Sequence, residues 1–148
     1  IEALGAAWRK YLLRNLLDAP DIENFIECNA TDMEDVPFHF HLLEICEHTG
    51  EIPEQVIRRA GIERTYGHQL FNGTRNPSRD KVIQLAIGFG LDFEATQQLL
   101  QAARKSLLYP KIKRDAAIIH CIHHKKDIYE TQALLETLEI TLLSGEKP

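Results

Sequence analysis

The spacing of apolar residues constrains the fold of this chain more than any other feature. Along nearly the whole sequence they recur every three or four positions, and no run of alternating β-branched residues appears. A period near 3.6 predicts amphipathic helices, whereas a half-buried strand needs a period of two. The sequence therefore predicts an all-α fold.

Prolines and glycines divide this pattern into separate helices. The first helix should stop at Asp18, because the residue before Pro20 disfavours the helical conformation. In the centre of the chain, helices are expected to begin at a proline and to end just before a glycine. Ser78 and Asp92 are the expected N-caps. The predicted helices cover residues 4–18, 22–26, 37–48, 53–60, 64–71, 79–89, 93–104, 111–126 and 127–140.

Charge is distributed unevenly along the chain. Residues 1–57 carry a formal charge of −9, residues 58–126 carry +8 and residues 127–148 carry −4, which together give the net charge of −5. A local field, rather than the total charge, attracts a polyanion such as nucleic acid. The basic centre is therefore a candidate for binding phosphate. A dipolar surface with internal ion pairs is the alternative interpretation.

Two short predicted helices, joined at residues 61–63, have the organisation of a helix-turn-helix motif. On the second helix the side expected to face the core consists of Tyr66, Gly67, Leu70 and Phe71. The opposite side consists of Arg64, Thr65, His68, Gln69 and Asn72, all of which can donate a hydrogen bond. Arginine can bridge the two major-groove acceptors of guanine, and glutamine or asparagine can pair with adenine. Each good pair gives about 1–3 kcal/mol of discrimination.

This stretch resembles a known family. Residues 52–73, IPEQVIRRAGIERTYGHQLFNG, and the following TRNPSRDKVIQLAIGFGLD are similar to the DNA-binding domain of the lambda repressor and Cro family, also called XRE-type. The resemblance covers residues 38–92 and rests on Gly61, LFNG at 70–73, RNPS at 75–78 and the run that ends at Asp92. It implies a lambda repressor-like five-helix domain that binds double-stranded DNA. The base-contacting residues that it implies are Arg64, Thr65, His68 and Gln69.

Three positions depart from the family's pattern. The family usually has a small alanine on the first helix of the motif and a larger aliphatic residue on the second, where the two helices touch. Here those positions hold Ile57 and Gly67, and because an exchange that conserves volume can keep a core packed, we interpret the pair as compensated. Pro53 stands where many members have a glutamine that braces the recognition helix against the phosphate backbone.

Polar and cationic residues follow the second helix of the motif directly. Such residues suit phosphate contacts, which hold a protein in register without reading sequence. The predicted phosphate-contacting residues are Asn72, Thr74, Arg75, Arg79 and Lys81.

Further along, Lys111, Lys113 and Arg114 fall in the first turn of a predicted helix, where the macrodipole disfavours cations. A phosphate, another acidic partner or the chain's own acidic N-terminal arm would offset that cost.

The remaining motifs predict no catalytic or metal chemistry. His120 and His124 have the spacing at which two histidines can share an ion, but no second ligand cluster accompanies them, so no metal or other cofactor is expected. The sequence contains neither a phosphate loop nor a nucleophile elbow, so we do not expect an enzyme. Cys28, Cys46 and Cys121 form no CxxC pair and are expected to be reduced. No apolar run approaches the roughly 20 residues that span a bilayer, and the expected location is the cytoplasm, away from membranes.

Together these features predict an N-terminal helical arm with an acidic linker (1–36), a helix-turn-helix domain (37–92) and a C-terminal helical extension packed on it (93–148). The predicted function is a sequence-specific, DNA-binding transcriptional regulator of a bacterium or a mobile element. A non-enzymatic protein interaction module on the same scaffold is the alternative. The N-terminal helix, with its stripe around Trp8, either folds back on the core or docks a second copy or a protein partner.

Overall fold

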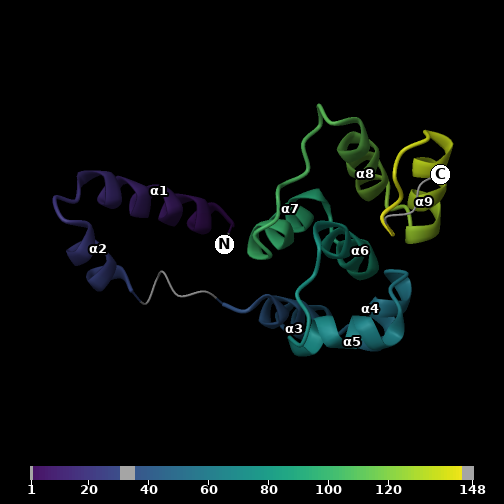
Figure 1. The fold of residues 1–148 in the computed structure, drawn as a ribbon, viewed down its shortest axis with the longest axis horizontal. Coiled ribbons are helices and arrows are strands. Elements are labelled where there is room, and N and C mark those ends of the chain that lie inside the picture. Colours follow the sequence, from purple (N-terminus) through teal and green to yellow (C-terminus); the bar gives the residue numbers. More distant parts are fainter. Residues whose placement is uncertain (1, 31–35, 145–148) are drawn as a thin grey trace. The chain divides into compact units, whose positions relative to one another are not determined.

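The structure is a computed structural model, and it describes residues 2–30 and 36–144, with side chains from residue 10 onward. Within these ranges the chain is helical and has no strand (Figure 1), which confirms the all-α prediction. The helices are α1 (Glu2–Asp18), α2 (Ile22–Asn29), α3 (Phe38–Thr49), α4 (Pro53–Arg59), α5 (Arg64–Asn72), α6 (Arg79–Phe89), α7 (Phe93–Ala102), α8 (Lys113–His123) and α9 (Ile128–Thr137). The side chain of Trp8 and residues 31–35 of the predicted linker lie outside the described part.

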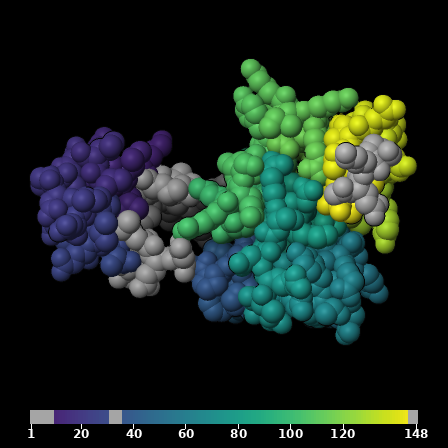
Figure 2. Space-filling model, viewed as in Figure 1, coloured from purple at the N-terminus to yellow at the C-terminus, as the bar shows by residue number. Residues whose placement is uncertain are grey.

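The chain divides into two compact units, Ile1–Asp35 and Val36–Pro148. The first unit contains α1 and α2, and the second contains α3 to α9. In the second unit, α7 packs on α6 and α8 on α7, while α9 contacts both α6 and α8. Figure 2 shows the green and yellow C-terminal segments against the teal central ones. The segment that follows Asp92 therefore shares one compact unit with the helices that precede it.

Helix α6 lies at the centre of the second unit. Its side chains are buried on almost every side, including Val82, Ile83, Leu85 and Ala86. The predicted N-caps are confirmed: the Ser78 hydroxyl accepts a hydrogen bond from the backbone of Lys81, and the Asp92 carboxylate accepts one from that of Ala95. These caps fix where α6 and α7 begin.

Helix α4 approaches α6 at Gly88, and this contact positions the helices before the candidate site. A β-carbon built on Gly88 would lie only 2.6 Å from the backbone oxygen of Val56. Any side chain at position 88 would therefore push α4 away from α6.

Helix α8 is shorter than predicted at both ends. It begins at Lys113 because Ile112, its N-cap, has an extended backbone, and it ends at His123. Lys111 consequently lies before the helix rather than in its first turn. None of the described helices is both long and apolar enough to cross a bilayer.

Candidate nucleic-acid interface

Helix α5 begins at a well-formed N-cap. The carboxylate of Glu63 accepts hydrogen bonds from the backbone nitrogens of Thr65 and Tyr66, at 3.0 and 2.8 Å. These two bonds lower the pKa of Glu63 below its ordinary value, because they favour the charged carboxylate. Gly61 and Gly73 adopt left-handed conformations at either side of the helix, with φ of 70° and 84°. The start of α5 is thus fixed by its own sequence.

The inward face of α5 packs tightly on α4, as the sequence predicted. Leu70, Phe71 and Gly67 are buried, and a β-carbon on Gly67 would lie 2.7 Å from Cγ1 of Ile57. Ile57 itself is buried, so it fills the space that a larger residue at position 67 would occupy. The predicted contact between Ile57 and Gly67 is confirmed.

The outward face of α5 carries the predicted base-contacting residues. Arg64 and Thr65 are exposed, and His68 and Gln69 are partly buried on the same side of the helix. Asn72, one turn further on, is also exposed. Within the second unit this face is therefore open at Arg64, Thr65 and Asn72.

Glu54, in the first turn of α4, binds two residues of this face. One carboxylate oxygen accepts a hydrogen bond from Nε of Arg64 at 2.8 Å, and the other lies 2.6 Å from Nε2 of His68. The bonds from Arg64 and His68 lower the pKa of Glu54, and the same contact raises the pKa of Arg64. All three side chains are at least 40% exposed, so the ion pairs remain accessible to water and to a ligand.

A second group of polar residues gathers beside the C-terminal half of α5. Nε of Arg75 donates to the side-chain oxygen of Gln69 at 2.9 Å. The guanidinium of Arg75 and the ammonium of Lys81 lie over the ring of Tyr66, at 5.5 and 5.8 Å from its centroid. These contacts place Arg75, a predicted phosphate-contacting residue, next to Gln69, a predicted base-contacting one, and they place Lys81 over the same ring as Arg75.

Asn72 and Thr74 form the turn that leaves α5. The side-chain oxygen of Asn72 accepts a hydrogen bond from the backbone nitrogen of Thr74 at 2.9 Å. Both residues are exposed, and this bond uses the side-chain oxygen of Asn72 rather than its nitrogen. The amide of Asn72 therefore keeps its donor side for other contacts.

Arg79, in contrast, is bound inside the protein. Its guanidinium makes two hydrogen bonds with the carboxylate of Asp115, at 3.0 and 2.8 Å, and its other donors reach the backbone oxygens of Ser106 and Leu107. The Asp115 side chain is 2% exposed. Because these donors are already used, we leave Arg79 out of the candidate interface.

Arg114 forms the reciprocal pair with the neighbouring residue of α6. Its guanidinium makes two hydrogen bonds with the carboxylate of Asp80, both at 2.9 Å, and donates to the backbone oxygens of Thr141 and Leu142. Asp80 of α6 therefore offsets this cation, and neither a bound phosphate nor the N-terminal arm is needed for it. Lys111 and Lys113 remain exposed.

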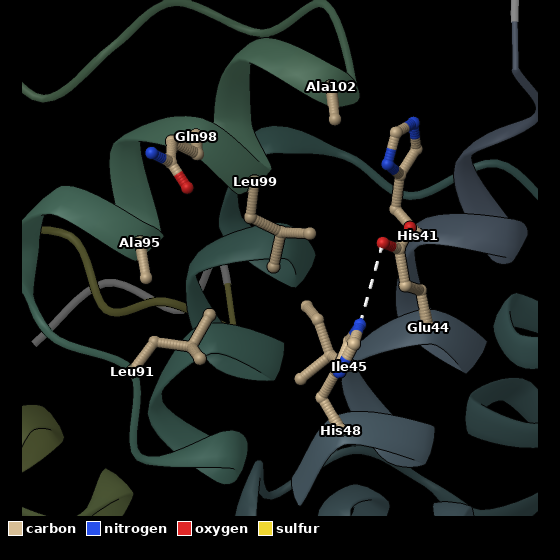
Figure 3. Close-up of a pocket in the computed structure, with 9 residues that line it drawn as sticks. All are labelled: His41, Glu44, Ile45, His48, Leu91, Ala95, Gln98, Leu99 and Ala102. Carbon is tan, nitrogen blue, oxygen red and sulfur yellow. Dashed lines mark ion pairs between the residues drawn. The ribbon is translucent and has the colours of Figure 1, made fainter. Parts of the chain in front are cut away.

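Two hollows lie near the α3 helix. The first, about 230 Å³, lies between α3 and α7, with Ile45, Leu91 and Leu99 inside it and His41, Glu44 and His48 along its rim (Figure 3). The second lies beside α5 and is lined mainly by apolar side chains, with polar residues of the candidate interface at its edge. Its lining residues are Leu43, Ile52, Pro53, Glu54, His68, Phe71 and Asn72.

The histidines at the end of α8 lie against one another. The ring centroids of His120 and His124 are 4.3 Å apart, and those of His123 and His124 are 5.2 Å apart. The nearby His120 lowers the pKa of His124, with smaller effects of burial, His123 and Lys126. Among the described residues, no three histidine, cysteine or acidic side chains gather in a way that could hold a metal ion.

Glu54 is the residue of this site that the sequence did not single out. Its only signal was a carboxylate in the first turn of α4, a position that the macrodipole favours for reasons unrelated to a site.

Comparison of the chain with protein-family models, with curated proteins and with solved structures gives no match.

Proposed function

We propose that this protein is a sequence-specific DNA-binding regulator, in which α4 and α5 act as a helix-turn-helix motif of the lambda repressor-like kind. The observation that carries the proposal is the outward face of α5, where Arg64, Thr65, His68 and Gln69 lie together on a helix that is only nine residues long. A short helix whose opposite side is packed into a core can enter the major groove with these side chains first.

The hydrogen bond from Arg64 to Glu54 supports this role for Arg64. It uses Nε and leaves the two terminal nitrogens of the guanidinium for other acceptors. Guanine presents two acceptors in the major groove, and a guanidinium in a fixed orientation can bridge them. In this proposal Glu54 holds Arg64 ready in the free protein, so that less side-chain freedom is lost on binding.

The phosphate contacts in the proposal come from Arg75, Lys81, Asn72 and Thr74. Arg75 and Lys81 both lie over the ring of Tyr66 in α5, where they could contact the DNA backbone beside a recognition helix. A cation over an aromatic ring keeps its charge, and it remains able to approach a phosphate.

Selection from a random duplex library tests the proposal. At a salt concentration of about 0.15 M, non-specific binding is weak, so enrichment reports base contacts. We expect one short enriched motif that the chain binds at least about a thousandfold more tightly than scrambled DNA. A flat enrichment profile, with equal binding to all duplexes, would contradict the proposal.

A protein interaction module is the second candidate function, and the apolar hollow beside α5 favours it. Leu43 and Ile52 are exposed there, next to Glu54 and His68. DNA offers few apolar groups to such a surface, whereas a protein partner could insert an aliphatic side chain. The substitution Leu43→Ser separates the two candidates: it leaves DNA selection unchanged if α5 reads bases, and it weakens partner binding if the hollow is a docking site.

A further inference from the structure

The helices α1 and α2 expose an unusual number of large aliphatic side chains. Leu13 is 54% exposed, Leu17 73%, Ile22 54% and Ile26 47%, whereas Phe25 is the one buried residue among the described side chains of this unit. Two successive helices that expose this many aliphatic side chains form a candidate interaction surface.

On α1 the exposed apolar residues share a face with cations. Lys10, Leu13, Arg14 and Leu17 are spaced i, i+3, i+4 and i+7, and all four are exposed. Residues at this spacing lie in one row along a helix. The free face of α1 is therefore an aliphatic stripe with a basic flank.

On α2 the exposed apolar residues are flanked by carboxylates. Ile22 and Ile26 are one turn apart, and Glu23 and Glu27 form a second row about 100° further round the helix. All four side chains are exposed. The free face of α2 is therefore an aliphatic stripe with an acidic flank.

We propose that these two faces bind each other between two copies of the chain, so that α1 and α2 form the interface of a symmetric dimer. In a two-fold interface every contact occurs twice, with α1 of one copy on α2 of the second copy and the reverse. The stripes then cover one another, and Lys10 and Arg14 meet Glu23 and Glu27. A second copy is the partner that fits, because the chain itself carries both halves of the complementary pattern.

The molar mass of the whole chain in solution tests the dimer. Sedimentation equilibrium of the unaltered chain should give twice the monomer mass, and Leu13→Glu with Leu17→Glu should give the monomer mass. Tyr129→Glu is the matched control. Tyr129 is 75% exposed, which is close to the 73% of Leu17, but it lies in the second unit. This control should remain a dimer.

Charge reversal tests the pairing of the flanks. Arg14→Glu and Glu27→Lys each place like charges across the interface, and each should raise the dissociation constant of the dimer about tenfold. The double variant restores opposite charges, and its dissociation constant should return to within about threefold of the original. A loss of helix structure in α1 or α2 would not be reversed in this way.

Three results would overturn the dimer: a monomeric unaltered chain, a dimer that survives the two glutamate substitutions, or a double charge variant that is weaker than either single one. The test is independent of DNA binding. A dimer that selects no DNA sequence would support this inference and contradict only the proposed function, and a monomer that selects one would do the opposite.

Discussion

Two regions of the second unit use arginine–carboxylate pairs, and they use them differently. Beside α5, Glu54 holds Arg64 where the arginine side chain is 75% exposed. Between α6 and α8, Arg79 pairs with Asp115 and Arg114 with Asp80, and these arginine side chains are only 23% and 20% exposed. Exposed pairs contribute little to stability, and their side chains can change partners easily. Breaking a buried pair, in contrast, leaves an uncompensated charge inside the protein.

This difference shows which arginines are available to a ligand. The sequence groups Arg64, Arg75 and Arg79 within one basic stretch, and nothing in their spacing separates them. Their partners distinguish them: Asp115 is 36 positions away from Arg79 in the chain, and the two residues meet only after folding. A basic stretch is therefore a mixture of structural and available cations.

The largest effect is expected when the buried pair is broken. Arg79→Ala leaves the carboxylate of Asp115 buried without its cation, and we expect a loss of about 3 kcal/mol in the free energy of unfolding. Urea denaturation measures it. The double variant with Asp115→Ala should be less destabilised than the two single losses added together, because the stranded charge is removed. A loss below about 1 kcal/mol for Arg79→Ala would mean that this pair behaves like the exposed one.

The contact beneath α5 should respond to substitution more weakly, and its sign should depend on Ile57. Gly67→Ala places a methyl group against Ile57, and overpacking outweighs the gain in helix propensity, so we expect a net loss of about 1 kcal/mol. In an Ile57→Ala background the clash is gone. There the same substitution should stabilise the protein by up to about 1 kcal/mol, since alanine favours a helix over glycine.

Thermal denaturation of the four proteins measures this reversal. If Gly67→Ala has the same effect in both backgrounds, Ile57 is not what excludes a side chain at position 67. In that case the rigidity of α5 would come from its cap and its ion pairs rather than from its inward packing.

Acid should weaken the fold around α5 by a smaller amount. In the folded protein, the backbone hydrogen bonds from Tyr66 and Thr65 lower the pKa of Glu63 below the ordinary 4.5. A lowered folded-state pKa contributes stability above the unfolded-state pKa, and this contribution is lost as the pH falls through the folded-state pKa. The urea concentration at the midpoint of denaturation should therefore decrease as the pH is lowered below about 4.5. Glu63→Gln should make this decrease smaller. An identical pH profile for Glu63→Gln would contradict the role of the cap.

The smallest effect on stability is expected from the exposed pair itself. Glu54→Gln should leave the denaturation midpoint unchanged within error, because both partners are solvated. It should, however, weaken discrimination at the base pair that Arg64 reads, since the guanidinium loses its fixed orientation. Glu51→Gln is the matched control: Glu51 pairs with Arg59, away from the outward face of α5, and its loss should change neither property. A large shift in midpoint for Glu54→Gln would remove the contrast between the two regions.

Sequence alone was sufficient for the positions of the helices, apart from the two ends of α8, and for the inward face of α5. Periodicity placed the helices, and the caps Ser78 and Asp92 were recognisable because a cap is a local feature. The contact between Ile57 and Gly67 was also predictable, from the resemblance to the lambda repressor and Cro family. The roles of Glu54 and Arg79 were not, because each depends on a partner that only the tertiary fold brings near.

The most direct test of the central claim, that the exposed face of α5 reads bases, compares Arg64→Ala with Arg75→Ala on a panel of duplexes that differ at single base pairs. We predict that Arg64→Ala removes discrimination of about tenfold or more at one base pair and leaves the others intact. Arg75→Ala should weaken every duplex alike and reduce the slope of log K against log salt by about one. Equal weakening of all duplexes by both variants, or no change with Arg64→Ala, would contradict base reading by α5.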